Sequence, residues 1–143
     1  MNILYVANKF PKLSESFILN ELYELDERGH TVSVFSLNEP DEDISHNEIQ
    51  KLDVTTHYAE LSVLRSFSSL FSKYVLNRSV LQSTMFIDTP FYHSKCLRLG
   101  RQIIETVERN DIDLIHAHFA TSNRLAVTYA ASYHNIPCTV TAL

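Results

Sequence analysis

Two histidines separated by one residue are the side chains in this sequence best suited to chemistry. His116 and His118 lie in the run Ile-Asp-Leu-Ile-His-Ala-His, whose composition predicts a strand over 112–118. Alternate residues of a strand project to the same face, so the two imidazoles should lie side by side. One of them could contact a substrate or relay a proton to it, His118 being nearer the end of the strand. The alternative is that both are structural histidines.

A metal site is a third interpretation, because His-x-His is a ligand spacing that metal-dependent hydrolases use. Such a site requires further ligands. The remaining histidines show no spacing that would supply one: His30, His46, His57, His93 and His134. We therefore expect no bound metal at His116 and His118.

The segment Asn8–Ser16 follows the first predicted strand and is the second candidate for ligand binding. No glycine occurs between residues 1 and 28, which argues against the glycine-rich phosphate loops of dehydrogenases and P-loop NTPases. The helix that follows still offers free N–H groups at its start, where an anion or sugar hydroxyls could bind. The flanking polar side chains are Lys9, Lys12, Ser14 and Ser16. The alternative is that Ser14 or Ser16 simply caps the helix.

Alternating strands and helices must position these two segments. Strand patterns occur at 2–7, 31–37, 54–58, 112–118 and 138–142, and helical patterns at about 16–28, 92–109 and 121–135. The alternation predicts an α/β fold, a Rossmann-like doubly wound parallel sheet in the strand order 3-2-1-4-5. Such sheets bind ligands beyond the carboxyl ends of their strands, which places the candidate site between 8–16 and 116–121.

Composition narrows the class of protein further. The 143-residue chain has a net charge of −5 and a pI near 5.7, which argues against a nucleic-acid partner. Cys96 and Cys138 lie far apart and form no C-x-x-C motif, so a disulfide framework is not expected. The N-terminus lacks the pattern of a signal peptide. We therefore expect a cytoplasmic protein.

The middle of the chain changes its charge balance abruptly. The charged residues of 38–60 are acidic except for Lys51, whereas 61–87 contain Arg65, Lys73 and Arg78, no acidic residue, and many aromatic and aliphatic side chains. The second stretch predicts a helix that either covers one face of the sheet or lies on an anionic membrane surface. We therefore expect, as one interaction, peripheral contact of 61–87 with the inner face of a membrane.

Three segments together resemble a known family. The run FPKLSESFILNE at 10–21 resembles the F-P-x-x-S-E-T-F-I-x-x-E opening of family-4 glycosyltransferases that build bacterial exopolysaccharides, colanic acid among them. The run IHAHFA at 115–120 is similar to their I-H-A-H-F-[GA] segment. The run IPCTVTA at 136–142 is similar to the stretch that leads to T-A-H in that family.

The resemblance implies the N-terminal half of a GT-B fold, with 1–143 as the acceptor-side domain and a C-terminal donor-binding domain absent. It implies retaining transfer of a hexose from a nucleotide sugar to a glycan or lipid-linked acceptor, without a metal or other cofactor. It also implies a catalytic role for His118. The residues that it implies for contact with the acceptor or diphosphate are Lys9, Ser14, Glu15, Ser16, His116 and Phe119.

One position departs from the family pattern. Leu143 stands where the family has the histidine of T-A-H, and we expect a vector-derived residue at a boundary rather than a natural replacement. The full-length protein is then a hexosyltransferase and the fragment alone is inactive. The alternative is a stand-alone doubly wound binding or regulatory domain without catalysis. A flavodoxin-like receiver is disfavoured, because Ala7-Asn8-Lys9 stands where its acidic cluster would lie.

Overall fold

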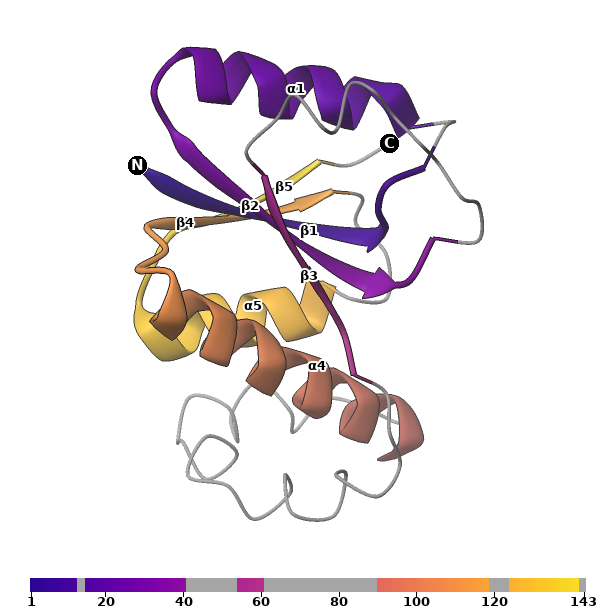
Figure 1. Cartoon of the computed structure of the whole chain (residues 1–143). Helices are drawn as coiled ribbons and strands as arrows, with labels where there is room; N and C mark the ends of the chain where they lie inside the picture. The colour runs from indigo at the N-terminus through magenta and orange to yellow at the C-terminus, as the bar shows by residue number, and fades with distance from the viewer. Residues whose placement is uncertain (13–14, 41–53, 61–89, 119–123, 142–143) are drawn as a thin grey trace.

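Five parallel strands form one sheet in the order β3-β2-β1-β4-β5, as the sequence predicts (Figure 1). The computed structural model describes residues 1–12, 15–40, 54–60, 90–118 and 124–141, with the backbone alone over 90–94. The strands are β1 (Asn2–Lys9), β2 (Thr31–Asn38), β3 (Thr55–Tyr58), β4 (Leu114–His118) and β5 (Cys138–Thr141). The first strand thus reaches beyond its predicted end at residue 7, and β4 begins later than the predicted residue 112.

The central strand β1 pairs with a parallel strand on each side. Val6 lies opposite Phe35 of β2 and opposite Ala117 of β4. The outer pairs, β2 with β3 and β4 with β5, are parallel as well. All carboxyl ends therefore meet at one edge, and the chain order reverses between β1 and β4, where such sheets bind ligands.

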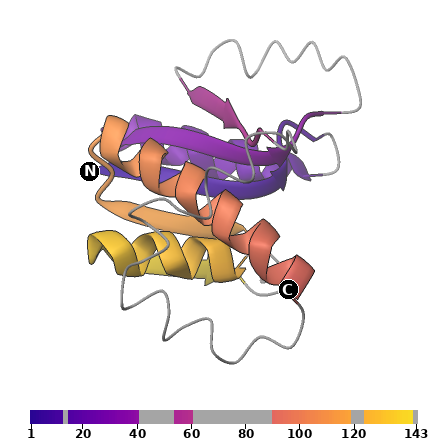
Figure 2. The ribbon, with the colours of Figure 1, turned by 90° about the horizontal axis from the view of Figure 1, so that it is seen from below.

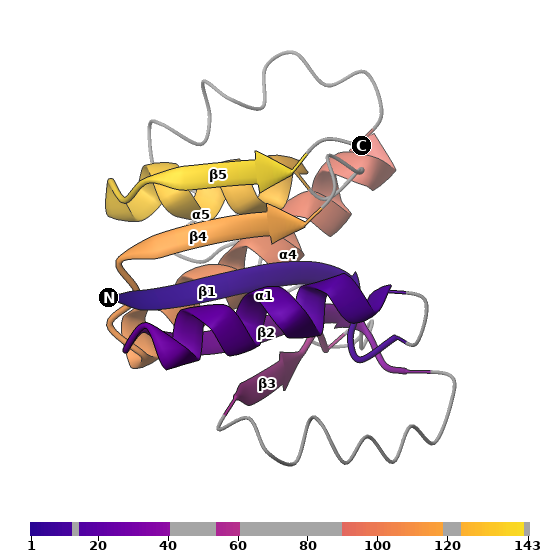
Figure 3. The ribbon, with the colours of Figure 1, turned by 90° about the horizontal axis from the view of Figure 1, so that it is seen from above.

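Helices cover both faces of the sheet. The helix α1 (Ser16–Glu27) lies on one face, and α4 (Pro90–Arg109) and α5 (Arg124–His134) lie on the other (Figures 1 and 2). Seen from above, α1 runs over β1 and β2, and no described helix covers β4 and β5 on this face (Figure 3).

Alternating side chains divide the core into two clusters. Leu4 and Val6 of β1 pack with α4 and α5, whereas Ile3, Tyr5 and Ala7 pack with α1. Burying one aliphatic side chain completely contributes about 1.5–3 kcal/mol to the free energy of unfolding. The apolar stripe predicted for α4 is buried, which confirms it: Cys96, Leu99, Ile103 and Val107.

The carboxyl end of α1 follows the sequence prediction. Gly29 adopts a φ of 80°, a left-handed conformation that glycine takes at little cost. Its N–H donates to the Asp26 carbonyl at 2.8 Å, and the His30 N–H donates to the Leu25 carbonyl at 3.0 Å. These two bonds form a Schellman motif, which ends the helix and leads the chain directly into β2.

The other helix ends lie only partly within the described residues. Pro90 is the first residue of α4, a position that needs no N–H donor. After α5 ends, Asn135 adopts a φ of 54°, in keeping with the predicted stop. Thr121 and Ser122, which begin the helical pattern of 121–135, lie outside the described residues, as does the whole of 61–87. None of the described helices combines the length and apolar character needed to cross a membrane.

Gly100 marks a close approach of α4 to α5 and yields a stability prediction. A Cβ at this position would overlap the Tyr129 ring, lying 2.9 Å from Cε1, and would lie 3.3 Å from the Ala126 carbonyl oxygen. We expect Gly100→Ala to lower the free energy of unfolding by about 1–3 kcal/mol, because the ring must leave its packed position. Chemical denaturation measures the change.

The control is the same substitution in a Tyr129→Ala background, where it should cost less because the obstructing ring is gone. In a helix without such a contact, glycine to alanine normally stabilises. A gain in stability for Gly100→Ala alone would therefore contradict the close packing.

Candidate functional site

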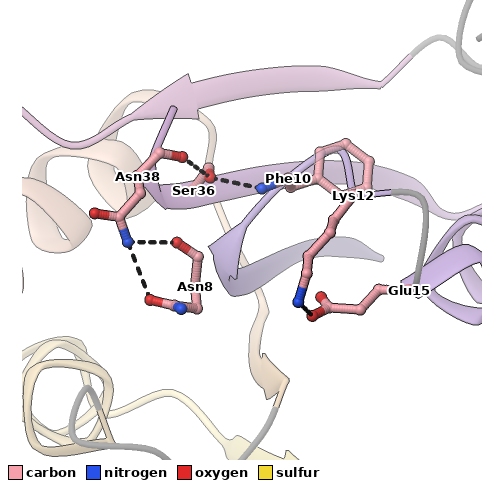
Figure 4. A network of polar contacts seen from close by, with 6 residues as sticks. All are labelled: Asn8, Phe10, Lys12, Glu15, Ser36 and Asn38. Atoms are coloured by element: carbon pink, nitrogen blue, oxygen red, sulfur yellow. Dashed lines mark hydrogen bonds and ion pairs between the residues drawn. The ribbon is translucent and has the colours of Figure 1, made fainter. Parts of the chain in front are cut away.

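The end of β2 holds the loop between β1 and α1 in place. The Ser36 hydroxyl accepts the Phe10 N–H at 2.9 Å and donates to the Asn38 carbonyl at 2.6 Å (Figure 4). The Asn38 side-chain amide donates to the Asn8 carbonyl at 2.9 Å and to the Asn8 side-chain oxygen at 3.0 Å. Lys9, a predicted site residue, ends β1 opposite Asn38. The start of the loop is therefore fixed by side chains of the neighbouring strand.

The first turn of α1 places Glu15 and Ser16 near the edge of the sheet where the strands end. Glu15 is the cap residue, Ser16 is the first helical residue, and the Glu15 side chain makes no hydrogen bond that caps the helix. The predicted cap by Ser16 is therefore wrong, because this residue already lies inside the helix; Ser14 is outside the described residues. The Glu15 N–H donates to the Lys12 carbonyl at 3.0 Å, and the Lys12 ammonium pairs with the Glu15 carboxylate at 2.6 Å. This ion pair opposes the charge that Lys12 would offer to an anion.

The two histidines of β4 lie on the face that α1 covers in part, side by side as predicted, with ring centroids 5.6 Å apart. The His116 ring lies between two hydroxyls of β5, with Nδ1 2.8 Å from Thr139 Oγ1 and Nε2 3.0 Å from Thr141 Oγ1. The His118 residue is only 3% exposed. The strand thus presents one half-buried and one buried imidazole.

A ring contact joins the two segments that the sequence predicts to meet. The Phe17 ring, in the first turn of α1, lies 5.2 Å from the His118 ring between centroids. On the other side, the Tyr5 ring of β1 lies 4.7 Å from the His116 ring. Phe17 directly follows the segment 8–16, so its contact with His118 places the start of α1 beside the end of β4. Phe119, also a predicted site residue, lies outside the described part of the chain.

Glu21 is the residue of this site that the sequence reasoning missed. It lies on α1, where the helical pattern assigns it to the outward face, yet its carboxylate accepts a hydrogen bond from the Tyr5 hydroxyl at 3.3 Å. Ligand-type atoms of Glu21, His116 and His118 all lie within 4.8 Å of one another. A third group that could ligate an ion therefore lies beside the histidine pair, one that the spacing of the histidines does not indicate. The available signal was the spacing of Phe17 and Glu21, which places both on one side of the helix.

Burial controls the protonation of the aromatic groups in this cluster. It raises the pKa of Tyr5 to about 12, and the charge of Glu21 and its hydrogen bond act in the same direction. Burial also lowers the pKa of His116, as does His118, while Glu21 opposes them. At neutral pH the phenol is therefore a donor to the carboxylate, and the His116 imidazole is neutral, with one nitrogen donating and the other accepting. Such a cluster can orient a hydroxyl group or coordinate a metal ion.

A family match accounts for this fold. The family model of Glycosyltransferase Family 4 matches residues 14–142, nearly the whole chain. The chain belongs to Glycosyltransferase Family 4. The resemblance inferred from the three sequence segments is thereby confirmed at the level of the family. No curated protein matches the chain.

Solved structures of several enzymes share the fold of this family-4 domain. UDP-GlcNAc 2-epimerase from Neisseria meningitidis, bound to UDP-GlcNAc, is 13% identical, with a TM-score of 0.57 over 98% of this chain and 32% of its own. A glycosyltransferase from Rickettsia africae ESF-5 is 14% identical, with a TM-score of 0.52 over 97% and 28%. A deacetylase from the teicoplanin biosynthesis pathway is 14% identical, with a TM-score of 0.62 over 99% and 67%.

At these identities the likeness shows the fold alone. The chain spans 32% of the epimerase and 28% of the glycosyltransferase, so each of those enzymes contains much more than the region matched here.

The hydroxyl of Ser36 provides a test of how the β1–α1 loop is held. The serine is fully buried and satisfies both the Phe10 N–H and the Asn38 carbonyl. We expect Ser36→Ala to lower the free energy of unfolding by about 1–3 kcal/mol, because the buried N–H loses its acceptor. Hydrogen exchange of the Phe10 amide should accelerate more than that of amides within β1. Equal acceleration throughout β1 would show that the bond does not hold the loop separately.

Proposed function

We propose that this chain is the N-terminal, acceptor-side domain of a retaining glycosyltransferase built on the GT-B plan. The proposed reaction moves a hexose from a nucleotide sugar to a glycan or lipid-linked acceptor in polysaccharide biosynthesis. The observation that carries the proposal is the family match over 14–142, which includes the edge where α1 and β4 meet. A second domain would hold most of the donor, since the chain spans 28% of the Rickettsia africae glycosyltransferase.

His118 is proposed as the catalytic side chain, in contact with the reacting acceptor hydroxyl. It ends β4 beside Phe17 of α1, at the edge where parallel sheets bind their ligands. An imidazole there can accept the hydrogen bond of a hydroxyl group and hold its oxygen toward the donor. Further contacts with the acceptor or diphosphate would come from both sides of the edge: Lys9, Ser14, Glu15, Ser16, His116 and Phe119.

The proposed transfer uses no metal ion or other cofactor. Negative charge develops on the leaving diphosphate, and a helix N-terminus with basic side chains can stabilise it. Holding both reactants in line across the cleft between two domains lowers the barrier further, by about 7–11 kcal/mol in well-oriented reactions.

A lipid-linked acceptor would bring the enzyme to the cytoplasmic face of a membrane. We assign the contact to 61–87, which lie outside the described residues, so the assignment rests on their composition alone. The segment combines Arg65, Lys73 and Arg78 with aromatic and aliphatic side chains and has no acidic residue. Basic amphipathic segments of this kind bind anionic lipid surfaces.

The role of His118 can be separated from its contribution to stability. In the full-length enzyme we expect His118→Ala to lower kcat/KM by about 100-fold or more, because the acceptor hydroxyl loses its partner. Ser14→Ala should lower activity to a smaller extent. Turnover and melting temperature measured on the same preparations compare the two effects.

The matched control is His30→Ala, a histidine that directly precedes β2 and therefore lies at the opposite edge of the sheet. This variant should keep its activity. A loss in His118→Ala that merely follows the loss of folded protein would make the residue structural.

The two-domain account makes a prediction for the chain by itself. We expect the 143-residue chain to fold cooperatively but to transfer no sugar, because the proposed donor site lies on another domain. A nucleotide-sugar turnover assay and a denaturation curve on the same sample measure both properties. Turnover near the rate of the intact enzyme would refute the division of substrates between two domains.

A further inference from the structure

We propose that Glu21, His116 and His118 form a binding site for a divalent transition metal ion, Zn²⁺ above all. The proposed transfer needs no metal, and an ion bound here would compete with the acceptor for His116 and His118. The three residues come from two elements, α1 and β4, and each offers a ligand atom within 4.8 Å of the other two. The sequence alone suggests only two of these ligands, because Glu21 is separated from the histidines by more than ninety residues.

The geometry needs only a small adjustment to accept an ion. Tetrahedral zinc ligands bound at 2.0–2.1 Å lie about 3.3 Å apart, so separations of up to 4.8 Å must close by at most about 1.5 Å. Glu21 is an exposed residue of α1, and a change of rotamer can bring its carboxylate closer. The two histidine rings already lie on one face of the strand, and the His116 nitrogen that takes the ion must give up its threonine hydroxyl.

The donor set selects the class of ion. Two imidazole nitrogens with one carboxylate oxygen are a ligand set of zinc sites that leave a fourth position for water. Magnesium and calcium prefer oxygen ligands, and the two nitrogens therefore disfavour them. One carboxylate with two neutral imidazoles also lowers the charge of the ion without reversing it.

Groups around the three ligands already orient them. Each nitrogen of His116 lies at hydrogen-bond distance from a threonine hydroxyl, Thr139 at Nδ1 and Thr141 at Nε2. When one nitrogen binds an ion, the other can donate to its threonine, as metal-binding histidines usually do. The Tyr5 hydroxyl donates to Glu21 Oε2 at 3.3 Å, and the carboxylate has a second oxygen for the ion.

The exposure of Glu21 gives the cluster one solvent-facing side. On the face that carries α1, no described helix lies over β4 and β5 (Figure 3). Glu21 itself is exposed, whereas His118 is buried beside Phe17. The ion would therefore sit at the margin of α1, with protein below it and solvent beside it.

Zinc binding to the 143-residue chain, measured by competition with a chromophoric chelator, tests the proposal. We expect one equivalent of Zn²⁺ to bind. Glu21→Gln keeps the shape of the side chain but removes its charge, and should weaken binding at least tenfold. His116→Ala should weaken it by at least as much. Two variants serve as matched controls and should bind as the parent chain does: Glu24→Gln, on the same helix, and His30→Ala, at the opposite edge.

Cobalt gives a second readout that depends on ligand geometry. Co²⁺ in a four-coordinate site absorbs visible light far more strongly than hydrated Co²⁺, and Glu21→Gln should abolish this absorption. Because Glu21 is exposed, its variant should stay folded, which circular dichroism checks, even if His118→Ala does not. The proposal is overturned if no equivalent of Zn²⁺ binds, or if Glu21→Gln leaves the affinity unchanged, since the ion would then lie on other histidines.

Discussion

The pairing of β1 with a parallel strand on each side determines where the other parts of this domain can lie. Parallel pairing brings the strand ends together at one edge and forces every connection to cross a face of the sheet. Its register places Tyr5 opposite both Val34 and His116, so the phenol lies beneath α1 and beside the imidazole. A slip of β4 by one residue would turn both histidines toward α4 and α5, into an apolar core.

Much of this arrangement is predictable from the sequence. The strand order follows from the alternation of periodic patterns, and the shared face of His116 and His118 follows from their spacing. The start of α1 is not predictable in this way, since the ion pair of Lys12 with Glu15 shapes the turn that precedes it. Nor is the role of Glu21, because a charged residue on a helix normally faces solvent. Its contact with Tyr5 depends on how far α1 lies to the side of β1, which only tertiary packing determines.

The polar groups between α1 and β4 contribute little to the free energy of unfolding. A hydrogen bond within a protein contributes only about 0.5–1.5 kcal/mol net, whereas a buried polar group that loses its partner costs about 1–3 kcal/mol. Aliphatic side chains at these positions would stabilise the domain at least as well. Stability alone therefore does not explain why a phenol, a carboxylate and two imidazoles gather between α1 and β4.

The two threonines that flank His116 leave the tautomer of its ring open. A neutral imidazole carries its proton on either nitrogen, and a threonine hydroxyl can donate or accept. Rotating the hydroxyls of Thr139 and Thr141 therefore lets either tautomer keep both hydrogen bonds without moving any heavy atom. These two contacts thus hold the plane of the ring without deciding which nitrogen carries the proton.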